Sequence, residues 1–316
     1  MDKGDLETVH IGRDGWLFLV GGRNDVLRQY SSGGLSPELL ADWKGLHEDR
    51  HRRCGELGAR YLNLVVPEKI AVYDDRLDGL RIDVAASPAT QIAQALETSS
   101  ARDAHIDLQS LFRSRREDIQ LYLRTDSHWS FAGCHLAYEA ICRKAGASPY
   151  TALAAHETRH VDVVTGDLGM KLDPPRAEMG ESWRYPRLSD MVHANRLVRH
   201  FEAAGAVHAS GTASLTVYRT GATDADPRTL MVFGDSYTSH VYTENVGRLI
   251  GFLAETFREV HFVWANTIDY GYVARVRPDI VLTEIAERFM IELPMTEFDL
   301  SEYERSQFER KGGRQT

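Results

Sequence analysis

Short apolar runs alternate with amphipathic segments along this chain, and that alternation restricts the fold to a small group. The runs are rich in Val, Ile, Leu and Phe, which is typical of strands buried on both faces. They occupy residues 59–67, 229–236, 259–266 and 278–288. Helical spacing of apolar residues marks the segments 36–57, 87–97, 109–117 and 130–147. Strands that alternate with helices predict an α/β fold with a mainly parallel sheet between two helical layers.

The alternation breaks between residues 150 and 225. Stretches such as "ESWRYPRLSD" and "ASLTVYRTGATDADPRT" have the composition of strands and turns and lack a helical period. A chain of 316 residues, 43% of them hydrophobic, can bury one large core. We therefore expect a single domain over residues 1–316 with a partly β insertion at 150–225.

Charge and composition exclude several classes of protein. The formal net charge of −9 argues against a general electrostatic affinity for nucleic acid or anionic lipid. No apolar run approaches the ~20 residues of a membrane span, and the first residues lack the apolar core of a signal peptide. The chain as written is expected in the cytoplasm, or in the periplasm or cell envelope if a leader was removed. The widely spaced Cys54, Cys134 and Cys142 form no Cys-x-x-Cys motif and predict buried free thiols.

Ser236 is the first residue with a predicted chemical role. It lies in "LMVFGDSYTSH", where a central strand ends and a helix is expected to begin. Open α/β sheets bind their ligands at this end of the strands. Gly234 permits the tight backbone, and the unpaired N–H groups of a helix start can receive an oxyanion. Because a Ser hydroxyl alone is a poor nucleophile, a base must reach it.

Asp126 and His128 answer that requirement. They stand two residues apart in "LYLRTDSHWSFAG", just before a predicted helix. In an extended segment both side chains project to the same side, so the carboxylate can orient the imidazole and stabilise its charged form. The imidazole then remains free to take the Ser236 proton.

Seven blocks in order along nearly the whole chain give the sequence a resemblance to a known family. The blocks are "GRDGWLFL", "VVPEKIAVY", "HIDLQSLF", "YLRTDSHWSFAG", "GDLG", "VFGDSYT" and "IVLTEIAERF". The sequence resembles the SGNH-hydrolase-like acetyltransferases typified by the proteins that O-acetylate alginate. The resemblance implies a three-layer α/β/α fold, with Ser236 as nucleophile, His128 as base and Asp126 as the acid that orients it. It also implies acyl transfer through an acetyl-Ser intermediate to a sugar hydroxyl.

Further residues are candidates for the cleft. Gly234, Asp235, Tyr237 and Trp129 are predicted around the oxyanion hole or the cleft wall, with the backbone N–H of Ser236 as one oxyanion donor. Trp129 could instead pack beneath His128 in the core, which we favour over stacking on a sugar ring. Lys69, Tyr73 and Arg288 are predicted to bind substrate, and Arg288 could instead form an ion pair with Glu284 at a strand end. Asn24 and Asn266 are weaker candidates for the Asn that hydrolytic SGNH enzymes add, and His240 is a rival base.

A competing motif is "HETRH" at residues 156–160, which matches the His-Glu-x-x-His pattern of zinc proteases. Glu178 or Glu181 could complete such a site. The pattern needs a helix, whereas the residues that follow it alternate like a strand. We therefore expect no metal site there.

The sequence favours an O-acetyltransferase acting on carbohydrate. A carbohydrate esterase or deacetylase with the same three residues, and a non-catalytic carbohydrate-binding or assembly protein, are the alternatives. The resemblance implies no bound cofactor but an acetyl donor as co-substrate. It also implies a carbohydrate acceptor and a membrane acyltransferase that delivers the donor.

Overall fold

The computed structural model describes residues 8–30, 33–150, 158–206, 211–239 and 247–312. The strands are β1 (Val9–Ile11), β2 (Leu17–Leu19), β3 (Arg60–Val66), β4 (His105–Ile106), β5 (Thr158–Val164), β6 (Glu178–Arg184), β7 (Ser189–Ala194), β8 (Leu215–Thr220), β9 (Asp226–Gly234), β10 (Phe257–Trp264) and β11 (Ile280–Ala286). The α-helices are α2 (Pro37–Glu56), α3 (Lys69–Val72), α4 (Pro88–Leu96), α5 (Leu108–Arg115), α6 (Phe131–Ala145), α8 (Arg196–Ala203), α9 (Leu249–Thr256), α10 (Tyr270–Val276) and α11 (Leu300–Gly312).

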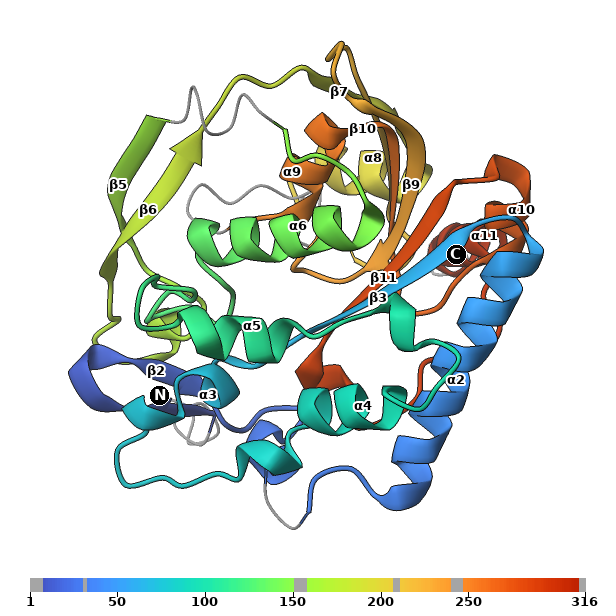
Figure 1. Ribbon diagram of the computed structural model, residues 1–316. Helices are drawn as coiled ribbons and strands as arrows, with labels where there is room; N and C mark the ends of the chain where they lie inside the picture. The colour runs from blue at the N-terminus through green and yellow to red at the C-terminus, as the bar shows by residue number, and fades with distance from the viewer. Residues whose placement is uncertain (1–7, 31–32, 151–157, 207–210, 240–246, 313–316) are drawn as a thin grey trace.

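A seven-stranded sheet in the order β4-β3-β11-β9-β10-β8-β7 organises the molecule (Figure 1). The pairs from β4 to β10 are parallel, and β8 and β7 add two antiparallel strands at one edge. β9 lies between β11 and β10, with Phe233 in register with Thr283 on one side and Val263 on the other. The predicted α/β class with a mainly parallel sheet is confirmed.

Both faces of the sheet are buried, which explains the continuous apolar runs. In β9, Leu230 and Val232 face one core with side chains of α5, α6 and α9. Met231 and Phe233 face the opposite core with side chains of α8, α10 and α11. α2 and α4 enclose a further cluster against β3 and β11. Helices on both sides of the sheet make the predicted three layers.

Side-chain and glycine caps define the ends of two helices. The hydroxyl of Ser36 accepts a hydrogen bond from Leu39 N at 3.2 Å and caps α2. Ser130 caps α6 in the same way through Gly133 N, at 3.1 Å. α6 ends at Ala145, and the following Gly146 caps it with a φ of 68°, the left-handed conformation that favours glycine.

The segment from 150 to 225 divides into two parts. β5 and β6 form an antiparallel two-stranded ribbon outside the main sheet, beside α6 (Figure 1). In contrast, β7 and β8 belong to the main sheet, and α8 is a helix where we expected none. Edge strands of this kind are specified by pairing with distant residues, which a local pattern does not record.

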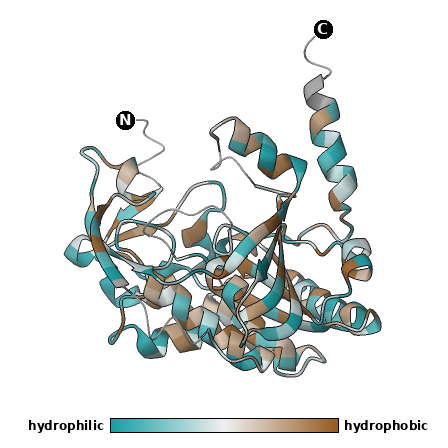
Figure 2. Ribbon diagram, turned by 90° about the horizontal axis from the view of Figure 1, so that it is seen from above, coloured by the Kyte–Doolittle hydropathy of each residue, from teal (hydrophilic) through white to brown (hydrophobic). Residues whose placement is uncertain are grey.

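The described part of the chain contains no helix with the length and apolarity needed to cross a bilayer. Cys54, Cys134 and Cys142 are buried free thiols, as predicted. The C-terminal helix α11 projects from the body of the molecule (Figure 2).

Candidate active site

Ser236 lies two residues beyond β9, in a tight turn at the edge where the parallel strands end. The Asp235 carboxylate shapes this turn. Its Oδ1 accepts a hydrogen bond from Tyr237 N at 3.0 Å, and its Oδ2 accepts one from Ala286 N at 2.8 Å. Asp235 is only 4% exposed, so it supports the turn from within and the prediction that it lines the cleft is wrong.

The residues directly after Ser236 form a turn, not a helix. Two backbone N–H groups of this turn donate back to the carbonyl oxygen of Asp235, and the next helix among the described residues, α9, begins at Leu249. The expected helix start is therefore wrong at this point. Residues 240–246, including the rival base His240, lie outside the described residues.

A buried carboxyl group, that of Glu284 in β11, stabilises the turn through hydrogen bonds. Its Oε2 accepts hydrogen bonds from Asp235 N at 3.0 Å and from the Thr238 hydroxyl at 2.8 Å. Burial and the neighbouring Asp235 carboxylate raise the pKa of Glu284 well above its ordinary value. Gly234 is required here, because a Cβ at this position would lie 2.7 Å from Glu284 Oε2.

Asp126 and His128 lie in a bend before α6 rather than in the expected extended segment. Asp126 Oδ1 accepts hydrogen bonds from both the backbone N–H and the Nδ1 of His128, each at 2.8 Å. The short loop therefore fixes the imidazole relative to the carboxylate more tightly than an extended chain would.

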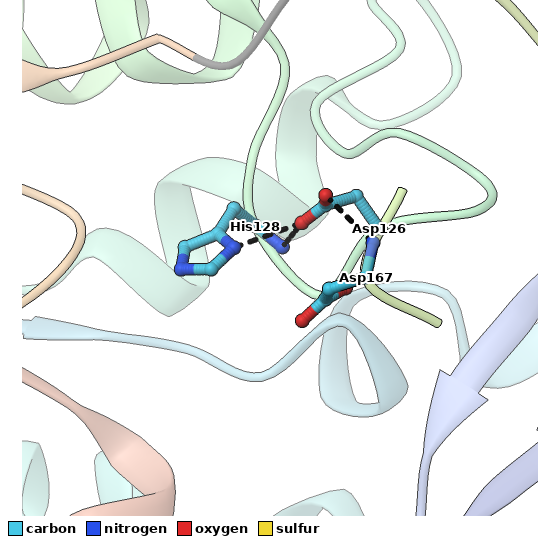
Figure 3. A group of neighbouring side chains, drawn as sticks. All are labelled: Asp126, His128 and Asp167. Carbon is cyan, nitrogen blue, oxygen red and sulfur yellow. Dashed lines mark hydrogen bonds and ion pairs between the residues drawn. The ribbon is translucent and has the colours of Figure 1, made fainter. Parts of the chain in front are cut away.

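The structure brings the three predicted residues together (Figure 3 draws the Asp126–His128 contact). His128 Nε2 lies 2.9 Å from Ser236 Oγ, and Nδ1 on the opposite side of the ring lies 2.8 Å from Asp126 Oδ1. Ser236 and His128 are half-buried, whereas Asp126 is 7% exposed. The arrangement can carry a proton from hydroxyl to imidazole, with the carboxylate stabilising the imidazolium.

Hydrogen bonding keeps the Asp126 carboxylate ionised. Burial alone would raise its pKa, but the hydrogen bond and charge of His128, together with backbone N–H groups, outweigh burial and lower the pKa well below the ordinary value. One of those N–H groups belongs to Asp167, 3.1 Å from Asp126 Oδ2. The residue is therefore a fixed negative charge at neutral pH.

Asp167, which the sequence did not single out, holds the same bend from the connection between β5 and β6. Its two carboxylate oxygens accept hydrogen bonds from the backbone N–H and the hydroxyl of Ser127, both at 2.6 Å. Ser127 stands between Asp126 and His128. The signal available was the "GDLG" block, but nothing in it indicated which segment its Asp would contact.

Lys69, predicted to bind substrate, is instead a buried support of the bend. Its ammonium donates to the carbonyl oxygens of Leu123 at 2.9 Å, Arg124 at 3.0 Å and Asp126 at 2.7 Å. These bonds use all three of its N–H groups. Burial lowers the pKa of Lys69 to about 8, against the opposing effect of Asp126.

The other predicted cleft residues near Ser236 also lie in the core. The Tyr237 hydroxyl donates to Ser127 O at 2.9 Å, and its ring packs behind His128 with the centroids 4.9 Å apart. Trp129 Nε1 donates to Gly247 O at 2.8 Å, and the indole is fully buried. Tyr237 packs against the imidazole and Trp129 packs against Tyr237 in turn, with centroids 4.8 Å apart. The prediction that Tyr237 lines the cleft is therefore wrong, and for Trp129 the alternative of core packing is the one observed.

Tyr73 and Arg288 are likewise held by the protein itself. The Tyr73 hydroxyl accepts a hydrogen bond from Leu121 N at 2.9 Å. Arg288 Nε lies 2.6 Å from the Glu68 carboxylate, so the ion pair of Arg288 is with Glu68 and the expected pair with Glu284 is wrong. Burial opposes the charge of Arg288, but Glu68 outweighs it and raises the pKa.

Two further groups beside Ser236 bear on its chemistry. Arg248, which sequence reasoning missed, donates from a guanidinium nitrogen to Ser236 O at 2.6 Å. The backbone N–H of Ser236 makes no hydrogen bond within the described part of the chain, whereas the N–H groups on either side of it are bonded. The Ser236 N–H as an oxyanion donor stays a prediction.

Asn24 and Asn266, far apart in sequence, line one small cavity of about 120 Å³ with Ile285 and Phe289. Arg50 donates to the backbone oxygen of Asn266 at 2.5 Å. The placement assigns neither amide a role, and their candidacy as oxyanion donors stays a prediction.

The part of the zinc-protease pattern that the structure describes lies in a strand, not a helix. His160 lies in β5, in register with Ser182 of β6, while the first two residues of the pattern lie outside the described residues. Among the described residues, ligand atoms of Asp126, His128 and Asp167 gather within 4.8 Å (Figure 3). Because the ring nitrogens of His128 are engaged by Asp126 and Ser236, hydrogen bonding already accounts for this group.

A doubly covered parallel sheet with a Ser at a strand end, in contact with a His, is the arrangement of SGNH-hydrolase-like proteins. Residues 9–265 match the family described as "SGNH hydrolase-like domain, acetyltransferase AlgX", and the chain belongs to that family. The resemblance drawn from the sequence is thereby confirmed. The chain is a member of a family of acyltransferases.

Individual relatives agree with this placement. The probable alginate O-acetylase AlgJ of Pseudomonas aeruginosa is 27% identical over 176 residues, which span 55% of this chain but only 39% of that relative. The O-acetyltransferase domain of Pseudomonas putida AlgJ has a similar fold, with a TM-score of 0.58 at 17% identity over 94% of this chain and 99% of that one. Bacillus cereus PatB1, with a sulfonyl adduct, gives 0.60 at 16% identity over 92% and 98%. The solved structures support the fold alone.

Proposed function

We propose that this protein is an O-acetyltransferase that moves an acetyl group to a carbohydrate hydroxyl through an acetyl-Ser236 intermediate. One observation carries the proposal: His128 Nε2 lies 2.9 Å from Ser236 Oγ while Asp126 engages the other ring nitrogen. Membership of an acetyltransferase family supports acetyl as the group, and a relative named as an alginate O-acetylase supports carbohydrate as the acceptor.

In the first half-reaction, His128 takes the Ser236 proton as Oγ attacks the carbonyl carbon of the donor. The carbonyl oxygen becomes an oxyanion, which the Ser236 N–H stabilises. The bond to the donor's leaving group then breaks, and His128 returns the proton to that group. Ser236 now carries an acetyl ester.

In the second half-reaction, a sugar hydroxyl takes the place that the leaving group has vacated. His128 removes its proton as the oxygen attacks the acetyl-Ser carbonyl. Collapse of the oxyanion breaks the ester to Ser236, whose Oγ recovers the proton from His128. The donor is a co-substrate and no bound cofactor takes part; we propose that a membrane acyltransferase partner delivers it.

The decisive assay uses a chromogenic acetyl ester with and without sugar acceptors. A transferase consumes the ester faster when an acceptor is present and yields acetylated sugar. Ser236→Ala should abolish consumption while leaving the fold intact, since it removes only one half-buried hydroxyl. If Ser236→Ala still consumes the ester, Ser236 is not the nucleophile.

The same assay separates the alternatives. Acceptor-independent hydrolysis at full rate identifies an esterase or deacetylase, in which water takes the place of the sugar hydroxyl. A folded protein that consumes no ester under either condition, and that binds sugar, is a carbohydrate-binding or assembly protein.

A further inference from the structure

Three neighbouring strands of the main sheet end at the same edge, and each is followed there by a charged or reactive side chain. β3, β11 and β9 are parallel and lie side by side in that order (Figure 1). Glu68, Arg288 and Ser236 each stand two residues beyond the end of one of these strands. Because parallel strands share their carboxyl edge, the sheet places Arg288 between a carboxylate and the candidate nucleophile.

Arg288 is a buried cation that Glu68 holds in place. Arg288 is 8% exposed and Glu68 2%. Arg288 Nε donates to Glu68 Oε1 at 2.6 Å, which uses one side of the planar guanidinium. The two terminal nitrogens have other partners: Nη2 donates to the Tyr237 hydroxyl at 2.9 Å, and Nη1 lies 3.4 Å from Ser127 Oγ. The guanidinium therefore links the ion pair both to the turn after β9 and to the bend before α6.

The Tyr237 hydroxyl joins the turn that carries the nucleophile to the bend that carries the base. Tyr237 directly follows Ser236 in the turn. Its hydroxyl donates to the backbone oxygen of Ser127, the residue before His128, at 2.9 Å. Burial raises the pKa of Tyr237 well above its ordinary value, so the hydroxyl keeps the proton that it donates. One donated hydrogen bond and one accepted from Arg288 hold the hydroxyl in a single orientation.

This link bears on the distance that the proton must cross. Ser236 and His128 are 108 positions apart in sequence, so contacts between the turn and the bend set the 2.9 Å between Oγ and Nε2. A displacement of about 1 Å in such a pair can lower the rate by about 10²-fold. The Tyr237 ring also packs against the imidazole, with 4.9 Å between the centroids. A shift of Tyr237 would therefore move the imidazole as well as the turn.

We infer that Arg288 is a positioning residue, which sets the distance between Ser236 Oγ and His128 Nε2 through the hydroxyl of Tyr237. The inference rests on the proposed function, because it concerns the reaction of the same site. Arg288 and Tyr237 are buried, so their link acts on the rate of the reaction and not on the binding of substrate. Loss of the link therefore lowers kcat and leaves KM unchanged.

Tyr237→Phe tests the link, because it removes the hydroxyl and keeps the ring against His128. We expect kcat for the chromogenic acetyl ester to fall by about tenfold with KM unchanged. The rate at which a sulfonyl fluoride labels Ser236 should fall by the same factor. In that labelling reaction Oγ forms a bond to sulfur, His128 takes the Ser236 proton, and fluoride leaves.

Tyr138→Phe is the matched control for the lost hydroxyl. Tyr138 is fully buried, and its hydroxyl also makes two hydrogen bonds, with the Thr256 hydroxyl and with Tyr150 N. The two variants should therefore show similar decreases in melting temperature. Only Tyr237→Phe should lose kcat and labelling rate, which separates positioning from a general loss of stability.

Arg288→Lys tests the cation without leaving Glu68 buried and unpaired. Lysine keeps the charge, but its single nitrogen cannot reproduce the planar fork that reaches Glu68 and Tyr237 together. kcat should fall about as far as in Tyr237→Phe. The double variant should be no slower than the slower single variant, because both substitutions break one link. Arg228→Lys is the control and should keep kcat, since Arg228 pairs with Asp226 at 2.6 Å where β9 begins.

Unchanged kcat and labelling in Tyr237→Phe, losses that multiply in the double variant, or a higher KM at unchanged kcat would each overturn the inference. The labelling rate separates the inference from the proposed function, because labelling needs Ser236 and His128 but no acetyl group or acceptor. Slower labelling of Tyr237→Phe, with no acetyl transfer by the unaltered chain, would refute the transferase and support the inference. A Ser236 that reacts no faster than an exposed serine of the same chain would refute both.

Discussion

Asp126 receives hydrogen bonds from three N–H groups, two of them on His128 and one on Asp167. Its backbone oxygen receives a fourth from Lys69, at 2.7 Å. Such a carboxylate has little freedom to turn, so it selects the His128 tautomer that carries hydrogen on Nδ1 and leaves Nε2 to accept the Ser236 proton.

Asp126→Asn tests whether the Asp126 carboxylate selects the His128 tautomer, because it replaces one carboxylate oxygen by an NH₂ group. The amide keeps the shape but removes the charge, and an amide N–H facing Nδ1 would favour the wrong tautomer. We expect kcat for acetyl-ester turnover to fall by roughly 10³–10⁴-fold with little change in the free energy of unfolding. A fall below tenfold would mean that the carboxylate does not orient the base.

Lys69→Met tests whether the pKa of the buried Lys69 ammonium is lowered, through the pH dependence of the unfolding free energy. The pKa of Lys69 is about 8 in the folded chain, against 10.5 ordinarily, so the unfolded chain binds more protons between these values. Its contribution to stability must therefore rise with pH across that window, by at most about 1.4 kcal/mol per pH unit. Urea unfolding from pH 8 to 10.5 should show this rise in the unaltered chain relative to the variant. Parallel pH profiles would show that Lys69 has an ordinary pKa.

Two substitutions of Glu284 test whether its hydrogen bonds stabilise the turn that carries Ser236. Glu284→Gln keeps an oxygen that can accept from Asp235 N and the Thr238 hydroxyl, whereas Glu284→Leu leaves both donors buried without a partner. The Leu variant should lose about 1–3 kcal/mol of unfolding free energy per donor, and the Gln variant clearly less. Equal losses in urea unfolding would show that these hydrogen bonds do not stabilise the turn.

Among elements, the β5–β6 ribbon acts most directly on the site. Gly166, in the connection between its strands, packs against the bend so closely that a Cβ would lie 2.4 Å from Thr125 O and 2.6 Å from Asp126 Cα. These are backbone atoms, which cannot swing aside as a side chain can.

Gly166→Ala should therefore displace the bend that carries Asp126. We expect a loss of about 1–3 kcal/mol in unfolding free energy together with a lower kcat for acetyl-ester turnover. Gly45→Ala in α2 is the control, because a Cβ there meets nothing within 4 Å and should stabilise the helix by up to about 1 kcal/mol. An unchanged kcat in Gly166→Ala would show that the β5–β6 ribbon does not position the bend that carries Asp126.

The elements also show where sequence reasoning succeeds. β3, β9, β10 and β11 were predicted because strands buried on both faces leave continuous apolar runs. The turn after Ser236 was missed because a side-chain contact, from Asp235 to Tyr237 N, replaces the helix that the local pattern favours. Lys69 and Asp167 could not be given their roles from sequence, since each depends on a contact between distant segments.

At the scale of the whole molecule, the sheet brings together residues far apart in the chain. Ser236 follows β9, in the middle of the sheet, while Asp126 and His128 precede α6, which packs on one face of it. His128 and Ser236 are 108 positions apart in sequence, yet their side chains lie within hydrogen-bonding distance. The spacing of Asp126 and His128 predicted the carboxylate–imidazole pair, and the family resemblance supplied its connection to Ser236. Their catalytic roles stay a prediction until chemistry is measured.

Trapping the covalent intermediate tests that prediction most directly. The protein is mixed with an activated acetyl ester, quenched in acid within the first turnover, and analysed by intact mass and peptide mapping. The account predicts one added acetyl group on the peptide that contains Ser236, and none in Ser236→Ala. Ester consumption with the acetyl group on another residue, or with Ser236→Ala labelled as fully as the unaltered chain, would contradict it.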